Sequence, residues 1–186
     1  MERHGVLLEP TLLPFERKAV LNPAVYQAGD TVHMYYRAID ESDVSSIGYA
    51  RLLGPTEVVE RWEAPLMVPE YEYESKGVED ARVVNIEGTL YMTYVAHDGK
   101  NAISAYASGT DLFHLEKRGI ISPTFSYHEA ISLFKPSVRK RLKDSYYLFS
   151  AYYEESAGRE AFTWHKDLIP FPKRIEGKFA MLHRVL

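Results

Sequence analysis

Polar side chains of both charge signs recur at the start of similar strand-forming segments in this chain. Asn22 opens one such segment, and the adjacent carboxylates of Glu79 and Asp80 open the next. Arg37 and Arg184 occupy matching places, each at the far end of a strand that leaves a turn. Because apolar strands carry both arginines, each guanidinium needs an anionic partner, either a bound anion or one of these carboxylates. The pattern therefore predicts an anion-binding site or a set of internal ion pairs.

The elements that carry these residues repeat about every 57 residues. Each repeat has a turn residue followed by a run rich in aromatic and β-branched side chains, which is the composition of a strand leaving a hairpin. A short strand precedes each turn. The four aligned runs are Asp30–Ala38, Gly88–Ala96, Asp144–Tyr152 and Gly177–Val185, and the strands before them are Ala24–Gln27, Arg82–Ile86, Ser137–Lys140 and Lys173–Ile175.

Further strands are expected after these hairpins. The third strands are predicted at Ser46–Arg51, Ala102–Ser108 and Glu160–His165, and fourth strands at Glu57–Trp62 and Phe113–Lys117. Four short antiparallel strands per repeat, without helical periodicity between them, are typical of a β-propeller, with a β-sandwich and a coincidental repeat as the alternative. The first strand of each propeller blade lines the central channel, so these segments should converge: Asn22–Val25, Glu79–Val83, Phe134–Val138 and Phe171–Ile175.

We therefore predict an all-β fold, a single incomplete β-propeller domain over residues 1–186. Its blades are expected at about 20–65, 78–122 and 134–168, and the first hairpin of a fourth blade at 171–186. Propellers close with about 4 to 8 blades, so these elements do not complete a ring. Unpaired blade edges expose backbone donors and acceptors, so we expect either further C-terminal blades or association into a homo-oligomer.

Composition argues against several classes of function. The chain has no cysteine, which rules out disulfides and thiolate metal sites, and its formal net charge of −4 offers no broad basic surface for nucleic acid or an anionic membrane. The short basic stretch Lys135–Lys143 is interpreted as a solvated turn. None of the seven histidines forms a ligand pair at helical spacing, so no metal site is predicted. No apolar run approaches the roughly 20 residues that span a bilayer, and a cytoplasmic protein is the default expectation.

Four motifs follow one another in a fixed order along the chain. They are Asn22-Pro-Ala24, Tyr36-Arg-Ala38, Tyr71–Arg82 and Lys166–Arg184. In type, order and spacing they resemble glycoside hydrolase family 130, which comprises β-mannoside phosphorylases and a few β-mannosidases. The resemblance implies a five-bladed propeller, and it covers the N-terminal three-fifths of a family member.

The resemblance also implies roles for residues that bind and cleave the sugar. The aspartate of the Gly-Val-Glu-Asp motif is the family's general acid, which assigns that role to Asp80. Asn22 and Arg37 would contact the sugar in the subsite that is cleaved. One departure lies next to the acid, where Ala81 replaces the proline usual in the family.

Phosphate binding is implied for a second group of residues, Arg184, His183 and Lys166. Arg184 ends the last motif, with His183 beside it. Lys166 and Asp167 stand where the familiar phosphorylases have an Arg-Asn pair. A lysine can still bind phosphate as a point charge, but it lacks the bidentate fork of arginine.

The implied reaction is the phosphorolysis of a β-linked mannoside, with inorganic phosphate as co-substrate and no cofactor. Inverting hydrolysis needs two carboxyl groups, one as acid and one to activate water. Phosphate is already an anionic nucleophile and needs positioning by cations, so one acid motif with several basic residues fits phosphorolysis better. The products would be mannose 1-phosphate and a shorter acceptor sugar. A β-mannosidase and a catalytically silent carbohydrate-binding propeller are the alternatives.

Overall fold

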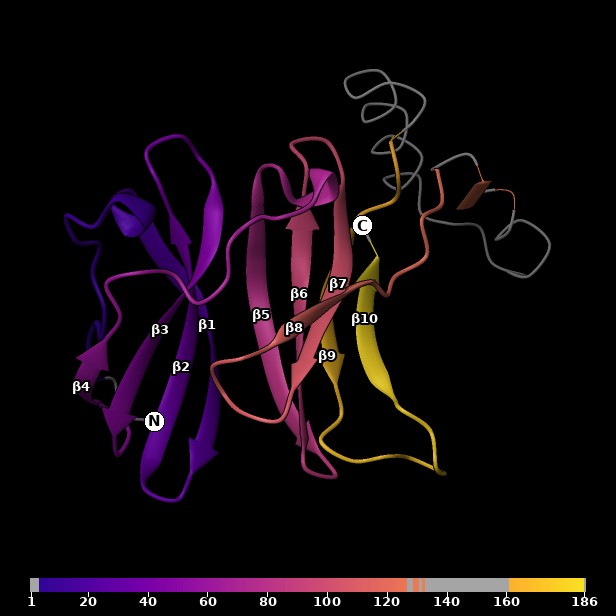
Figure 1. The fold of residues 1–186 in the computed structure, drawn as a ribbon. Coiled ribbons are helices and arrows are strands. Elements are labelled where there is room, and N and C mark those ends of the chain that lie inside the picture. Colours follow the sequence, from indigo (N-terminus) through magenta and orange to yellow (C-terminus); the bar gives the residue numbers. More distant parts are fainter. Residues whose placement is uncertain (1–3, 127–128, 131, 133–160, 186) are drawn as a thin grey trace.

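β-Strands make up most of the structure, a computed structural model that describes residues 4–126, 129–130, 132 and 161–185 (Figure 1). The two named helical elements are three-residue 3₁₀ turns, η1 (Pro14–Glu16) and η2 (Glu72–Glu74). The hairpin expected within 134–152 lies outside the described residues. The fold of the described part is all-β, as the sequence predicts.

The first four strands form one antiparallel unit. In sequence order they are β1 (Ala19–Ala28), β2 (Thr31–Ile39), β3 (Ser45–Leu53) and β4 (Glu57–Arg61), and each pairs with the next. The aromatic run of β2 forms the centre of this first unit because Tyr35 and Tyr36 are both almost fully buried. They pack on opposite sides, Tyr35 with Tyr49 and Tyr36 with Ala50.

The next four strands form a second unit with the same connectivity. They are β5 (Gly77–Ile86), β6 (Thr89–His97), β7 (Ala102–Gly109) and β8 (Glu116–Ile120). β8 begins three residues after the start expected from the sequence. The reason is the Asp111 side chain, whose Oδ1 accepts hydrogen bonds of 2.8 Å from the backbone N–H groups of Phe113 and His114 and keeps them in a turn.

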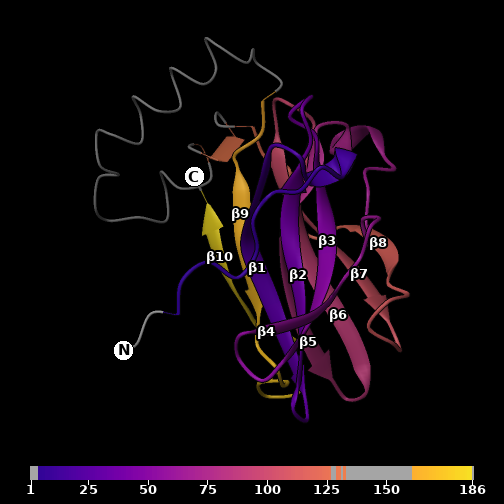
Figure 2. The same cartoon turned by 90° about the vertical axis from the view of Figure 1, so that its left-hand side faces the viewer.

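The two units meet where β3 and β5 begin. Ser45 and Gly77 form a parallel bridge between them, and a side chain at Gly77 would place its Cβ only 2.6 Å from the Cβ of Ser45. Glycine is therefore required for this close approach. Strands β1 and β5 also contact each other, and Figures 1 and 2 show the units side by side, with the β1–β2 and β5–β6 turns at the same end.

The C-terminal hairpin of the described residues, expected to open a fourth blade at 171–186, packs against the second unit, and its position corrects the sequence prediction. It consists of β9 (His165–Pro170) and β10 (Met181–Val185), which form a separate two-stranded sheet. The inner strand was expected at Phe171–Ile175, and Glu160–His165 was expected to be the third strand of the preceding blade. Both expectations are wrong for the described residues, because His165 begins β9 and residues 171–180 form the loop between β9 and β10.

The loop conformation explains the error. Pro172 lacks an N–H and cannot contribute a donor to a ladder. Ile175 and Lys178 exchange backbone hydrogen bonds of 2.9 and 3.0 Å across Glu176 and Gly177, whose φ angles are 50° and 74°. Positive φ at both central residues is the geometry of a tight two-residue turn. The residues of this turn have the composition that the repeat analysis expected between the two strands of a hairpin. The turn begins at Ile175, however, five residues beyond the end of β9.

β9 is attached to the second unit by side chains of that unit. The hydroxyl of Thr93 in β6 donates to the carbonyl of Leu168 at 2.6 Å, and that of Ser104 in β7 donates to the carbonyl of His165 at 2.8 Å. Each of these hydroxyls is buried. The hairpin is therefore held by hydrogen bonds that water does not weaken.

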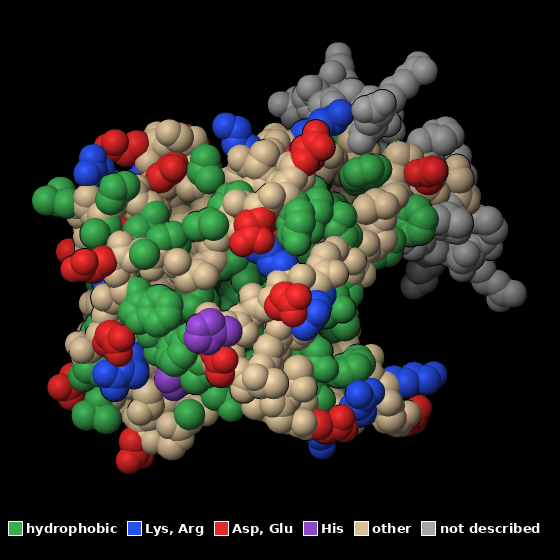
Figure 3. All heavy atoms as spheres, in the orientation of Figure 1, with side chains coloured by type: hydrophobic (Ala, Val, Ile, Leu, Met, Phe, Trp, Pro, Cys, Tyr) green, Lys and Arg blue, Asp and Glu red, His purple; other side chains and the backbone are tan. Residues whose placement is uncertain are grey.

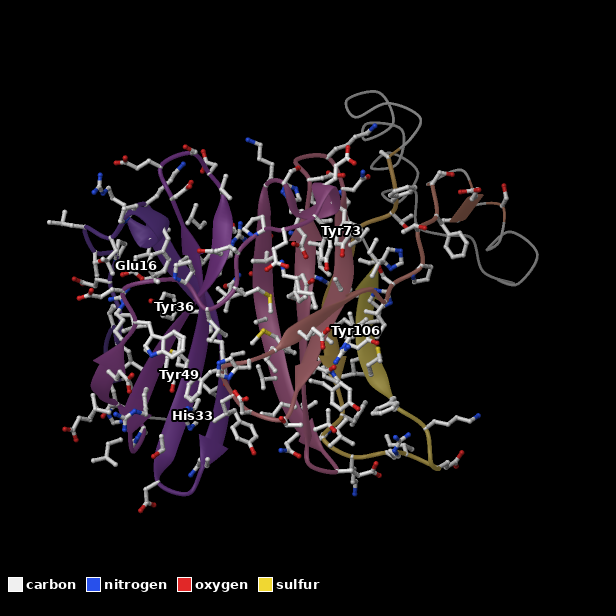
Figure 4. All side chains as sticks on the ribbon, in the orientation of Figure 1. Glu16, His33, Tyr36, Tyr49, Tyr73 and Tyr106 are labelled. Atoms are coloured by element: carbon white, nitrogen blue, oxygen red, sulfur yellow. The ribbon has the colours of Figure 1, made fainter. Side chains whose placement is uncertain are left out.

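Each unit also contains a buried triad of a glutamate, a tyrosine and a cation. In the first unit Tyr36 donates to Glu16 at 2.7 Å, and Arg61 lies 2.9 Å from the same carboxylate (Figure 4). The second unit repeats this arrangement with Tyr94, Glu74 and Lys117, where the hydrogen bond is 2.8 Å and the ion pair 2.5 Å. Both glutamates are fully buried, which is tolerable only because each is paired and hydrogen-bonded. The glutamates come from η1 and η2, so each triad ties the entry of a unit to its second and fourth strands.

The described residues on the face of the molecule in Figure 3 form no single basic patch. On the face in Figure 3, Lys and Arg side chains are scattered among acidic and hydrophobic ones rather than gathered into one patch. Among the described residues, no helix is long and apolar enough to cross a membrane.

Candidate active site

In the part of the chain that the structure describes, the first strands of the β1–β2, β5–β6 and β9–β10 hairpins each carry one residue in the left-handed conformation. These are Asn22 in β1, Asp80 in β5 and Asp167 in β9, with φ angles of 47°, 52° and 52°. At each of them the register between the paired strands shifts, as in a β-bulge. Asn and Asp are the non-glycine residues that adopt this conformation most readily, and bulges re-aim side chains next to functional sites. Three polar side chains are thus presented from equivalent places.

Asp80 contacts both residues for which the family resemblance implies a place in the sugar subsite. Its Oδ1 accepts a hydrogen bond of 2.8 Å from the Asn22 side-chain amide and lies 3.8 Å from Arg37 Nη1. The Asp80 side chain is 11% exposed and that of Arg37 is 19% exposed, so the contacts are shielded but accessible. Asn22, Asp80 and Arg37 therefore come together as predicted, from β1, β5 and β2.

Glu79 is the main partner of Arg37. Its Oε1 accepts a hydrogen bond of 2.7 Å from Arg37 Nη2, while Arg37 Nε donates to Ser45 Oγ at 2.9 Å. The other carboxylate oxygen, Oε2, lies 3.7 Å from Lys166 Nζ. Of the two partners expected for Arg37, a bound anion or an internal carboxylate, the structure shows the internal carboxylate. In the sequence analysis, Glu79 was considered only as a counter-ion for the arginines. Its position next to Asp80 in the sequence could have indicated that it belongs to the site.

Arg184 lies at the equivalent position to Arg37 but has a different partner. Arg184 pairs in register with Lys166, as Arg37 does with Leu21. Its Nη2 lies 2.6 Å from Asp167 Oδ2. The other oxygen of Asp167 lies 3.8 Å from Arg82 Nη2, so one carboxylate stands between two guanidinium groups. In the sequence analysis, Asp167 was named only beside Lys166, as the residue in place of the asparagine of an Arg-Asn pair, and Arg82 was not identified as a site residue.

His183 contacts a histidine rather than the acid pair. Its Nε2 is 2.9 Å from Nδ1 of His165, the two rings stack, and His165 Nε2 is 2.8 Å from the Thr163 hydroxyl. Burial, together with the neighbouring His183, lowers the pKa of His165 to about 4. Burial also lowers the pKa of His183. Both rings are therefore neutral at pH 7, so His183 can offer a hydrogen bond to an anion but no full positive charge.

Aromatic and imidazole groups border Lys166. Its ammonium lies 5.3 Å from the centroid of the Trp164 ring, and that ring meets His97 edge-on at 6.5 Å. Burial lowers the pKa of His97, although the carboxylate of Glu79 acts in the opposite direction. Neither Trp164 nor His97 was predicted for the site, since each falls outside the strand starts that the repeat analysis compared.

The arrangement brings together the carboxylates of Asp80, Glu79 and Asp167, several cations and hydrogen-bond donors, and among the residues described Asp80 is the carboxylate without an ion pair closer than 3.8 Å. The arrangement can deliver a proton from Asp80 and attract an anion toward Arg184 and Lys166. Among residues 4–126 and 161–185, no group of three or more His, Asp or Glu side chains is placed to hold a metal ion.

Comparison with known proteins identifies the family. The family model of glycoside hydrolase family 130, described as beta-1,4-mannooligosaccharide phosphorylase, matches residues 12–185. The chain belongs to glycoside hydrolase family 130.

A 1,2-beta-oligomannan phosphorylase from Thermoanaerobacter sp. (strain X514) is 27% identical over 191 aligned residues, which cover 95% of this chain and 51% of the relative. A beta-1,2-mannobiose phosphorylase from the same organism is 34% identical over 100 residues, 47% of this chain and 33% of the relative. The chain thus spans about half the length, or less, of these curated relatives.

Solved structures share the fold of this family member. A putative glycoside hydrolase from Parabacteroides distasonis has a TM-score of 0.59 and 21% identity, with 95% of this chain and 48% of that chain covered. The beta-1,2-mannobiose phosphorylase from Listeria innocua gives a TM-score of 0.59 and 18% identity over 88% of this chain and 50% of that chain. At these identities the likeness establishes the fold alone.

Proposed function

We propose that the protein is an inverting β-mannoside phosphorylase. It transfers a mannosyl group from a β-linked mannoside to inorganic phosphate and releases mannose 1-phosphate and a shorter acceptor sugar. The observation that carries this proposal is the contact of Asp80 with Asn22 and Arg37, at distances of 2.8 and 3.8 Å. The match to the family model supports the substrate class.

The residues at the site divide into three roles in the proposed reaction. Asp80 is the general acid that supplies the proton to the leaving oxygen. Asn22 and Arg37 bind the mannosyl group beside it. Arg184, Lys166 and the neutral His183 bind phosphate, which attacks the anomeric carbon from the face opposite the leaving sugar. Because phosphate arrives as an anion, these groups need to position it and do not need to deprotonate it.

The other two carboxylates at the site are occupied, which favours phosphorolysis over hydrolysis. Glu79 is paired with Arg37 and lies near Lys166, and Asp167 is paired with Arg184. A hydrolase needs a second carboxylate that is free to activate water. A carboxylate in a close ion pair has its lone pairs committed to the cation, which makes it a poor base.

We place the two four-stranded units and the β9–β10 hairpin as parts of a five-bladed propeller. The hairpin bulges repeat in all three, and each bulge carries Asn or Asp at the same place. The chain spans about half the length of its oligomannan phosphorylase relative, and the proposed activity is that of the whole protein.

Product analysis with and without phosphate tests the proposal. The purified protein is incubated with β-1,2- and β-1,4-linked mannobiose, and the sugars are separated by chromatography. Mannose 1-phosphate should form only when phosphate is present. Release of free mannose at the same rate without phosphate would identify a β-mannosidase instead. Binding of mannobiose without cleavage under either condition would identify a carbohydrate-binding protein.

A further inference from the structure

Glu79 links three separate parts of the fold at the site. It lies in β5 of the second unit, and its side chain is only 5% exposed. Its Oε1 accepts from Arg37 Nη2 of the first unit at 2.7 Å, and its Oε2 lies 3.7 Å from Lys166 Nζ of the β9–β10 hairpin. Ser45, at the junction of the units, donates to the same Oε1 at 3.4 Å. The carboxylate therefore holds one cation from each neighbouring element.

We propose that Glu79 is a positioning residue that fixes Arg37 against the sugar and restrains Lys166, and so sets the affinity for phosphate. This inference rests on the proposed phosphorolysis. Glu79 does not touch a reacting atom in this account. It acts through the two cations, one assigned to the mannosyl group and the other to phosphate.

The effect on the two substrates should be opposite. Arg37 is held by Glu79 through a charge-assisted hydrogen bond, so loss of the carboxylate charge leaves the guanidinium less well oriented for the sugar. The ammonium of Lys166 is attracted to the carboxylate of Glu79. An incoming phosphate must compete with this carboxylate for the ammonium, and the negative charge of the carboxylate also repels the phosphate. Removal of the Glu79 charge should therefore weaken sugar binding and strengthen phosphate binding. A residue with a purely structural role would weaken both.

The substitution Glu79→Gln tests this split because it keeps the shape of the side chain and removes its charge. With phosphate and mannobiose varied in turn, the KM for phosphate should fall at least about 3-fold, and kcat/KM for mannobiose should fall about 10-fold or more, as expected for loss of one charged hydrogen bond. Glu87→Gln is the matched control, since Glu87 pairs with Arg174 outside the site. It should leave both values unchanged.

A second variant shows whether Lys166 carries the effect. In a Lys166→Gln background, Glu79→Gln should no longer lower the KM for phosphate, because the cation that the glutamate restrains is gone. If Glu79→Gln does not fold by circular dichroism, Glu79→Asp is measured instead. It keeps the charge but draws it back from Lys166, so the KM for phosphate should again fall.

The outcomes separate this inference from the proposed function. If the wild-type protein shows no phosphate-dependent cleavage, the phosphorylase proposal itself is wrong. If the wild-type protein depends on phosphate but the Glu79 variant has an unchanged or a raised KM for phosphate, the role assigned to Glu79 is wrong. Persistence of the fall in KM in the Lys166→Gln background would also overturn it.

Discussion

The side-chain amide of Asn22 donates a hydrogen bond of 2.8 Å to Asp80, although the two residues are 58 positions apart in the sequence. Both occupy a left-handed bulge in the first strand of a four-stranded unit, with φ angles of 47° and 52°. The internal repeat thus places chemically different side chains at equivalent backbone positions and brings them into contact where the units meet. Asp167, with a φ of 52°, supplies the third equivalent position in β9.

Arg184 is expected to act on phosphate rather than on the sugar. Arg184→Ala removes a cation that Asp167 holds in place, so the KM for phosphate should rise about 10- to 100-fold, in line with the loss of a charged hydrogen bond. The KM for the mannoside should change by less than about 3-fold on the same scale. Steady-state kinetics with each substrate varied in turn provides the measurement.

Arg174→Ala, which removes an arginine of the β9–β10 loop, is the control and should leave both constants unchanged. A larger effect on the mannoside than on phosphate would reverse the assignment.

The two buried triads should contribute to stability by similar amounts. Burial and the hydrogen bond to Glu74 raise the pKa of Tyr94 far above its usual value, so its hydroxyl stays protonated and donates to the carboxylate. Tyr94→Phe leaves that buried carboxylate one donor short and should lower the free energy of unfolding by about 1 to 3 kcal/mol. Tyr36→Phe should have a similar effect through Glu16. Chemical denaturation monitored by circular dichroism measures both.

A tyrosine outside the triads provides the control for that experiment. Tyr106 lies in β7 of the second unit and is partly exposed (Figure 4). Tyr106→Phe should change the free energy of unfolding by no more than about 0.5 kcal/mol, the usual range for substitutions away from buried networks. If Tyr106→Phe lowers the free energy of unfolding as much as Tyr94→Phe does, the hydrogen bonds of the triads do not stabilise the fold more than other tyrosine contacts do.

The β9–β10 hairpin should lose stability in acid because of His165. The pKa of this buried imidazole is about 4 in the folded protein, against an ordinary value of 6.5. Between these two values the unfolded chain binds more protons than the folded one, so stability should fall as the pH drops from 6.5 toward 4, by at most about 3 kcal/mol. An NMR titration of the histidine resonances measures the pKa directly. His165→Phe should remove this part of the pH dependence, and a His165 that titrates near 6.5 would contradict the account.

The repeat in the sequence was sufficient to predict the number and order of the strands in the first two units, with β8 shifted by three residues. Aromatic and β-branched runs follow turn residues at a constant spacing, and that local signal does not depend on the rest of the fold. The first strand of the hairpin expected at 171–186 was misplaced because Lys173–Ile175 before Gly177 has the composition of a strand before a turn. What decides the true strand is a pair of buried hydroxyls, Thr93 and Ser104, that bind the backbone of β9 from another unit.

The site was predicted in part for a similar reason. The repeat placed Asp80, Asn22 and Arg37 at the ends of strands, and the resemblance to the family assigned their roles. The partners of the cations could not be assigned, since pairing of Arg37 with Glu79 and of Arg184 with Asp167 depends on distances between units. The neutral state of His183 likewise depends on its burial against His165, which is not visible in the local sequence.

The most direct test of the account is the phosphate-dependent cleavage of a β-linked mannobiose by the Asp80→Asn variant. The amide preserves the shape of the side chain but cannot deliver a proton, so the rate should fall at least about 100-fold while the circular dichroism spectrum stays that of the wild type. Asp43→Asn makes the same change at another left-handed aspartate, with φ 62°, in an exposed turn, and it should retain full activity. An Asp80→Asn protein that keeps more than about a tenth of the wild-type rate would show that the general acid lies elsewhere.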